Sequence, residues 1–222
     1  MVQEEEESAF SKIEALLSNK LANKGTNGSD KFEELQSLLS PAQTLLREIK
    51  RQMGGAFSGQ NIILCDPSNT KEVMIALIKF ALDNGKAPVL VLTAMNYKIV
   101  LGLIGDAKIN EKKVSIIDTV SKGIAKVQAT DRILFVDSIR NLTQMEIKVF
   151  NFIEKDPNSC FIFDSLDVMQ LYHDDEVIGK FVYALTKLLH KHKRVGVYLL
   201  NRKSLLSKLN QFVDSSVELK KM

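Results

Sequence analysis

From Gln60 onward the sequence alternates short apolar runs with longer amphipathic segments, and this alternation most constrains the fold. The runs are continuously apolar, as strands buried on both faces of a sheet must be. Alternating strands and helices form right-handed crossovers, so the pattern predicts an α/β fold with a doubly wound, mainly parallel sheet flanked by helices. The predicted strands are 61–65, 88–93, 114–118, 133–136, 160–163, 195–200 and 216–219, and the predicted helices are 70–84, 97–104, 142–155, 176–192 and 204–209.

The first 53 residues have a different character, because they contain no strand-like run. Two helices are expected there, separated by a loop at 24–30. In the second helix apolar residues recur at spacings of three and four, which is the pattern of a heptad seam. Pro41 either kinks this helix or begins a new one that Ser40 caps. The seam consists of Phe32, Leu35, Leu39, Ala42, Leu46, Ile49 and Met53.

This heptad seam has two interpretations. In one, the helices form a hairpin that packs on the protein's own domain. In the other, the seam mediates self-association or binds a protein partner, although about three heptads are marginal for an isolated coiled coil. The residues that would make that contact are Phe32, Leu35, Leu39, Leu46 and Ile49. The expected organisation is a helical extension at 1–53, a linker at 54–60 and an α/β domain at 61–222.

Composition excludes some classes of protein. Hydrophobic residues make up 45% of the 222 residues and charged residues 26%, which is ordinary for a chain with a core. A net charge of +3 gives no reason to expect binding to nucleic acid or membranes. No apolar run reaches the ~18 residues of a membrane span, and the glutamate-rich start is unlike a signal peptide. Cys65 and Cys160 lie far apart in apolar runs, which indicates buried thiols and a cytoplasmic protein.

Aspartate followed closely by Ser or Thr recurs where the apolar runs end. Asp66, Asp118, Asp137 and Asp164 each follow a predicted strand, whereas Asp214 precedes one. In a parallel sheet, ligands bind at the carboxyl ends of the strands, so a carboxylate there can hold magnesium through water. The alternative is structural, because Asp and Ser after a strand form turns and cap helices. The three histidines show no spacing typical of a metal site.

The segment after the first predicted strand lies where a phosphate-binding loop would be built. Such a loop reads G-x-x-x-x-G-K-[ST], and its glycines let backbone N–H groups surround phosphate. Only Lys71 of that pattern is present. Asp66 adds negative charge and Pro67 removes an N–H donor, so the segment argues against a phosphate cradle. Weak anion binding at the start of the helix remains open. The replaced positions are Cys65, Thr70 and Glu72.

Two motifs together resemble the RecA-type P-loop ATPase core. One is the strand–loop–helix unit with Lys71, and the other is four apolar residues at 160–163 followed by Asp164, Ser165 and Leu166. The second is similar to the Walker B strand of the KaiC-like branch, in particular of degenerate archaeal KaiC-like proteins. The resemblance covers about residues 60–219. It implies a RecA-like sheet with a vestigial nucleotide site, in which Lys71 would contact phosphate and Asp164, beside Ser165, would lie at the magnesium position.

Compared with the family that it resembles, the chain lacks a residue needed for ATP hydrolysis. Relatives that hydrolyse ATP carry a glutamate just after the second strand, whereas residues 92–96 contain no carboxylate here. We therefore expect a pseudo-ATPase with no catalytic residue and no required cofactor or metal. The expected function is that of a regulatory or signalling domain that binds proteins and forms oligomers. One alternative is a nucleotide-binding switch without hydrolysis, in which Lys71 and Asp164 would face a shared open cleft. Another is a DNA-associated recombinase paralogue, whose DNA affinity would depend on salt.

Overall fold

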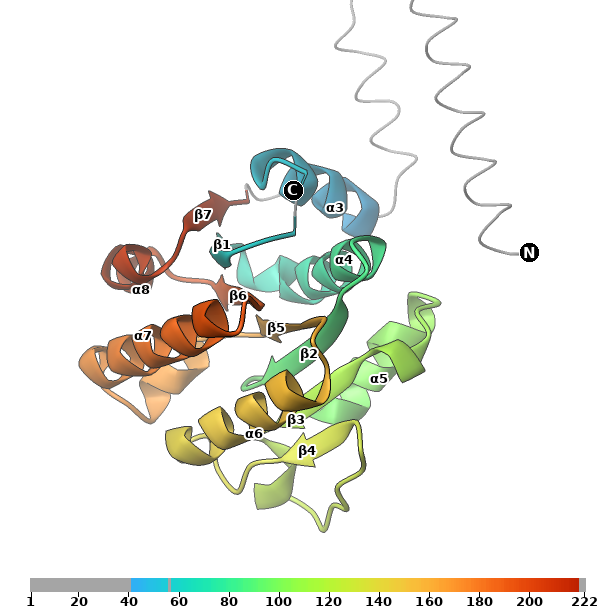
Figure 1. Cartoon of the computed structure of the whole chain (residues 1–222), viewed down its shortest axis with the longest axis vertical. Coiled ribbons are helices and arrows are strands. Elements are labelled where there is room, and N and C mark those ends of the chain that lie inside the picture. The colour runs from blue at the N-terminus through green and yellow to red at the C-terminus, as the bar shows by residue number, and fades with distance from the viewer. Residues whose placement is uncertain (1–40, 56, 220–222) are drawn as a thin grey trace, which may run out of the picture. The chain divides into compact units, whose positions relative to one another are not determined.

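The sheet observed in the computed structural model, which describes residues 41–55 and 57–219, has seven parallel strands. Their order is β4-β3-β2-β5-β6-β1-β7 (Figure 1). The predicted α/β class and all seven predicted strands are confirmed. The strands are β1 Gln60–Leu64, β2 Ala87–Leu92, β3 Ser115–Asp118, β4 Ile133–Phe135, β5 Ser159–Phe163, β6 Val195–Leu200 and β7 Ser215–Glu218.

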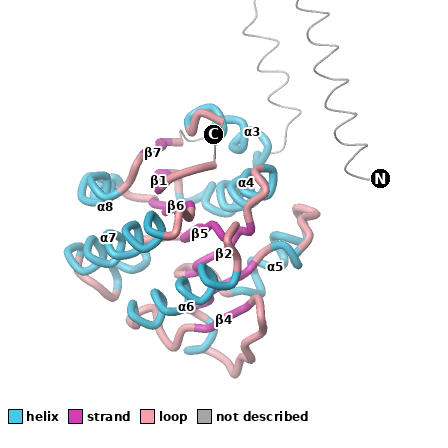
Figure 2. Tube along the Cα trace, viewed as in Figure 1, coloured by secondary structure: helices cyan, strands magenta, loops and turns pink. Residues whose placement is uncertain are grey.

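Helices cover both faces of this sheet, as a doubly wound fold requires (Figure 2). One face packs against α3, α4 and α5, and the other against α6, α7 and α8. All five helices predicted after residue 60 are present, with ends shifted by at most a few residues. The helices are α3 Pro41–Gln52, α4 Thr70–Asp83, α5 Tyr97–Asp106, α6 Leu142–Lys155, α7 Asp175–Lys191 and α8 Lys203–Leu209.

The central strands divide the core into two hydrophobic clusters. Along β1, Ile63 belongs to the cluster beneath α3, α4 and α5, whereas Ile62 and Leu64 belong to the cluster beneath α6, α7 and α8. Successive side chains on a strand point to opposite faces, so one apolar run supplies both clusters. All three side chains are buried. This explains why the strands are continuously apolar in sequence rather than alternating.

Helix α3 packs within the α/β domain, although the sequence analysis placed it in a separate extension. Leu45 and Ile49 on this helix are only 2% and 0% exposed and belong to the cluster that α4 shares. The compact unit therefore runs from Pro41 rather than from about residue 61. The physical reason is that the apolar face of α3 is covered by this domain. Three of the predicted seam residues lie outside the described part of the chain, namely Phe32, Leu35 and Leu39.

The two cysteines are free thiols inside the core, as predicted. Burial raises the pKa of Cys65 to about 11 and that of Cys160 to about 12. Because the thiolate is the reactive form, neither residue is suited to act as a nucleophile near neutral pH. Within the residues that the structure describes, no helix is both long and apolar enough to span a membrane.

Candidate functional site

The loop between β1 and α4, where a phosphate-binding loop would lie, is closed by its own hydrogen bonds. The carboxylate of Asp66 accepts hydrogen bonds from the Ser68 N–H at 2.9 Å and the Ser68 hydroxyl at 2.6 Å. The Asp66 carbonyl accepts from the Asn69 N–H, and the Pro67 carbonyl accepts from the Thr70 N–H. The N–H groups of Ser68, Asn69 and Thr70 are therefore occupied within the loop.

Lys71 lies in the first turn of α4 and is exposed. Its side chain has no hydrogen bond or ion pair with any described residue. The next residue, Glu72, is half-buried, and one of its carboxylate oxygens is buried without a partner in the described structure. A carboxylate beside Lys71 opposes the binding of phosphate there.

Asp164, the predicted magnesium-site residue, is fully buried at the end of β5. One of its oxygens accepts hydrogen bonds from the N–H and the hydroxyl of Thr93, both at 2.7 Å. The other accepts from the N–H groups of Ala94 and Met95, each at 3.1 Å. Burial raises the pKa of Asp164, and these hydrogen bonds oppose that shift. The carboxylate thus stabilises the loop after β2 from inside the protein.

Ser165 takes part in the same interaction. It is buried, and its carbonyl oxygen accepts a hydrogen bond from the Thr93 hydroxyl. Thr93 is therefore held by two consecutive residues that follow β5. Asp164 and Ser165 follow β5 directly and both contact Thr93. Lys71, by contrast, is on the surface, and Asp164 exposes no area with which the two residues could share an open cleft.

Asp118 at the end of β3 repeats this arrangement. Its carboxylate is 0% exposed and accepts hydrogen bonds from the N–H groups of Tyr97, Val120 and Ser121 at 2.7–2.8 Å. The Ser121 hydroxyl donates to it as well, at 2.6 Å. Asp118 and Asp164 are buried acceptors, and Asp66 is a partly buried one. Their contacts are those of the structural interpretation, in which such residues form turns and stabilise loops.

The sequence analysis missed a polar centre at Asn201, directly after β6. Its side-chain amide donates hydrogen bonds to the Cys65 carbonyl and to the Thr70 hydroxyl, each at 3.1 Å. Its backbone N–H donates to the carboxylate of Asp167 at 2.5 Å, and burial raises the pKa of that carboxyl group. These contacts connect the ends of β1 and β6 to the start of α4. The available signal was a polar residue directly after an apolar run.

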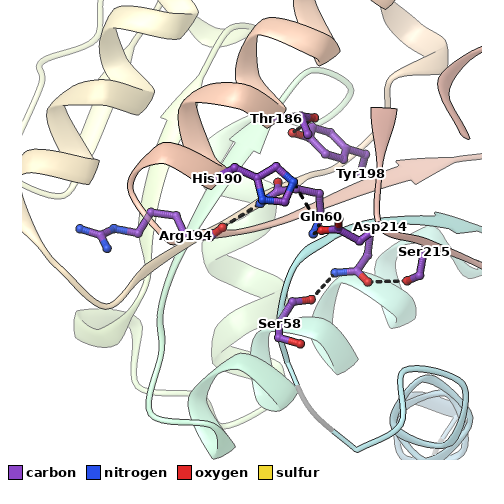
Figure 3. A network of polar contacts seen from close by, with 9 residues as sticks. Ser58, Gln60, Thr186, His190, Arg194, Tyr198, Asp214 and Ser215 are labelled. Carbon is purple, nitrogen blue, oxygen red and sulfur yellow. Dashed lines mark hydrogen bonds and ion pairs between the residues drawn. The ribbon is translucent and has the colours of Figure 1, made fainter. Parts of the chain in front are cut away.

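Asp214, the fifth acidic residue, lies at the opposite, amino-terminal edge of the sheet (Figure 3). Its carboxylate accepts a hydrogen bond from the Gln60 N–H at 2.7 Å and lies 3.5 Å from the ring nitrogen Nε2 of His190. Gly59 has a φ of +70°, and a Cβ there would lie 2.8 Å from this carboxylate. The Gln60 side chain in turn donates to the Arg194 carbonyl at 2.7 Å. This network fixes the start of β1.

A basic cavity of about 500 Å³ lies at the same edge of the sheet, at the starts of β2, β3 and β5. Sequence reasoning did not identify it, because its cationic residues come from four separate segments of the chain. The side chains that give it its charge are Lys86, Lys112, Lys113, Arg132 and Lys155.

Comparisons with known proteins give little beyond the fold. No protein-family model matches the chain, and no curated protein matches it. Among solved structures, it is similar to the cytoplasmic domain of EssC with 14% identity and a TM-score of 0.40, over 73% of this chain and 32% of that one. The chain thus spans about a third of that structure. What the structure itself establishes is a seven-stranded parallel α/β sheet.

Proposed function

We propose that this chain is a non-catalytic RecA-like domain, of the KaiC-like type, that acts by binding other proteins in a regulatory role. One observation carries the proposal: the loop between β1 and α4 directs its N–H groups onto Asp66 and Pro67 instead of presenting them to a ligand. Electrostatic stabilisation of phosphate by such groups is usually the largest contribution to this chemistry. Without these N–H groups, the transition state of phosphoryl transfer loses most of its electrostatic stabilisation.

The second support is the state of Asp164. Its two oxygens already accept hydrogen bonds from the loop after β2, so holding a metal ion would require that loop to be released. Residues 92–96 also lack the glutamate expected in active relatives, and losing a general base commonly costs about 10²–10⁴-fold in rate. These features favour protein binding over a nucleotide switch.

Exposed apolar side chains indicate where a protein partner would bind. Most of the large apolar side chains that the described structure exposes lie on α6, on α7 or in the segment just before α7. Ile147 is 53% exposed and Leu171 is 75% exposed. Exposed apolar groups gathered on one side of a protein are typical of interaction sites. We call this the α6–α7 surface, and it comprises Ile147, Phe150, Leu171, Tyr172, Val177 and Tyr183.

The heptad seam contributes less to partner binding than its sequence pattern suggests. Ile49 is buried in the core of its own domain, and Leu46 packs against that core. Self-association through the rest of the seam, at Phe32, Leu35 and Leu39, stays a prediction. Sedimentation velocity on the full chain and on the triple variant Phe32→Ser/Leu35→Ser/Leu39→Ser tests it. Loss of an oligomer in the variant is the expected result, and a monomer in both excludes self-association by this route.

Titration calorimetry with ATP and magnesium tests the central proposal, together with an assay for phosphate release. We expect release at the level of a buffer blank and no binding that depends on Lys71. The control is Lys79→Ala, which removes a lysine from the same helix. Micromolar binding that Lys71→Ala abolishes and Lys79→Ala preserves would establish the nucleotide switch instead. Phosphate release abolished by Asp164→Asn would establish an enzyme.

The α6–α7 surface is tested with a double variant in which aspartate replaces Ile147 and Phe150. Sedimentation velocity compares the complexes that the wild type and this variant form. The variant should lose an assembly that the wild type forms, while its far-ultraviolet circular dichroism is unchanged. Asp substitutions at Lys148 and Asn151, which lie on the same helix, are the matched control. An assembly that survives in the first variant would remove this surface from the proposal.

A further inference from the structure

The basic cavity lies at the amino-terminal edge of the sheet, whereas the loop between β1 and α4 lies at the carboxyl edge. The cavity opens between the starts of β2, β3 and β5, close to the ends of α4 and α6. Ala87, Ser115 and Ser159, the first residues of these three strands, line it. Its volume of about 500 Å³ is that of a site for a small organic ligand.

The charged side chains that line the cavity are mostly positive. Five cationic side chains and a single carboxylate, that of Asp156, contribute to it. None of the five cations forms an ion pair with a described residue. The Asp156 carboxylate instead accepts a hydrogen bond from the Asn158 N–H at 2.8 Å. The cations are Lys86, Lys112, Lys113, Arg132 and Lys155.

Two of these cations are held in place by neutral groups. Arg132 donates to the Glu111 carbonyl at 2.5 Å, and Lys155 donates to the Asp131 carbonyl at 2.7 Å. Carbonyl oxygens position the two side chains without neutralising their charge. The residues Glu111 and Asp131 themselves line a separate, smaller cavity of about 320 Å³, which Arg132 also borders.

Ser159 is one of the residues that line the cavity. The residue is 2% exposed, and its hydroxyl oxygen is buried without a hydrogen-bond partner in the described structure. A buried hydroxyl without a partner is destabilising, so such groups are normally paired. A ligand oxygen in the cavity would provide the missing partner after a rotation about the side-chain bond.

The ends of two helices account for only part of the positive charge. The C-terminus of a helix carries about half a negative charge, which nearby positive side chains balance. Two helices, α4 and α6, have their C-terminus here. After those two ends and Asp156 are counted, an excess of about three positive charges remains. Like charges around one cavity repel one another, so the arrangement favours an anion of similar charge.

We propose that this cavity binds a small phosphorylated anion with the charge of a di- or triphosphate. Arg132 offers the planar donor group that pairs with phosphate oxygens, and the lysines offer point charges around it. The site is independent of Lys71 and Asp164, so the inference goes beyond the proposed function. The bound anion would make this domain a sensor of a phosphorylated metabolite.

Titration calorimetry of the full chain with inorganic tripolyphosphate tests this proposal, at about 50 mM salt, where screening is weak. We expect one site per chain whose affinity falls as salt is raised. Lys113→Gln/Arg132→Gln should weaken binding by about tenfold or more for each positive charge removed. Lys187→Gln/Lys191→Gln, which removes two lysines from α7, is the matched control and should bind like the wild type.

Three results would overturn the proposal: no binding up to millimolar tripolyphosphate, equal loss in both double variants, or binding that only Lys71→Ala abolishes. Tight binding of single-stranded DNA that tripolyphosphate does not displace would assign the surface to nucleic acid instead. If Lys113→Gln/Arg132→Gln fails to fold by circular dichroism, Lys86→Gln/Lys112→Gln replaces it. An absence of tripolyphosphate binding leaves the proposed protein-binding function intact, because that function is tested separately at the α6–α7 surface. Binding that only Lys71→Ala abolishes would count against both.

Discussion

At the scale of single residues, the carboxylates at the strand ends accept hydrogen bonds from the protein's own backbone. Asp118 and Asp164 each accept hydrogen bonds from backbone N–H groups of a neighbouring segment, and Asp66 accepts one from the Ser68 N–H of its own loop. A carboxylate supplied by the chain satisfies those donors permanently, whereas a phosphate would come and go. The same residues thereby stabilise the loops that follow the strands.

Replacing Asp164 with alanine tests this role directly. The change leaves the N–H groups of Thr93, Ala94 and Met95 without their acceptor inside the protein, at about 1–3 kcal/mol for each unsatisfied group. We expect the free energy of unfolding to fall by about 3 kcal/mol or more. Urea denaturation measures it, with Asp137→Ala on the surface as the control. A loss for Asp164→Ala no larger than that of the control would contradict the role.

Asp167 predicts a dependence of stability on pH. Burial raises its pKa in the folded protein, so the folded state binds this proton more tightly than the unfolded chain does. The contribution of Asp167 to stability is therefore complete below about pH 4, the unfolded value, and is lost as pH rises through the folded pKa. Asp167→Asn keeps an acceptor for the Asn201 N–H and removes the titration. The difference in unfolding free energy between the two proteins should change over that pH range, and a constant difference would refute the prediction.

At the scale of elements, α3 shows how one heptad seam contains residues with different environments. Ile49 is fully buried against the cluster beneath α4, whereas Leu46 is only partly buried. A spacing of three and four specifies an apolar face but not what covers it. Here the covering element is α4, which follows α3 in the chain.

Ile49→Ala and Leu46→Ala form a matched pair for this helix. Truncating the buried Ile49 should destabilise the protein by about 2–5 kcal/mol, because a cavity is left in the core. Truncating Leu46 should cost clearly less, since part of its surface already contacts water. Thermal denaturation of both variants measures the difference. Equal losses would mean that the described packing of α3 is not the one adopted in solution.

At the scale of the whole molecule, the sheet order separates two edges of opposite character. The carboxyl edge holds buried aspartates that are paired with backbone groups, and the amino edge holds a cavity surrounded by cations. A net charge of +3 conceals this separation, because acidic and basic residues nearly cancel when counted along the chain.

The compact unit from Pro41 to the end of the chain predicts how truncation acts. A fragment of residues 41–222 should melt cooperatively, close to the temperature of the full chain. A fragment of residues 61–222 loses α3 and exposes the surface that Leu45 and Ile49 cover, so it should melt several degrees lower. Circular dichroism during heating distinguishes the two. The boundary at Pro41 would be contradicted if fragment 41–222 melted well below the full chain while fragment 61–222 did not.

The sequence by itself determined the fold class and the strand and helix positions. The run at 195–200, for example, was predicted with the bounds that β6 has, because a strand buried on both faces needs an unbroken apolar run. It also brought Asp164 and Ser165 to the end of a strand. These properties are local, so a short stretch of sequence carries them.

Only the tertiary structure decided what those residues contact. It placed the Asp164 carboxylate on the loop after β2, buried Ile49 beneath its own domain, and gathered Lys86, Lys113, Arg132 and Lys155 around one cavity. Each outcome depends on segments far apart in the chain that the strand order brings together. Sequence periodicity reports the environment of a residue along its own element, whereas its partners are set by the order of the strands in the sheet.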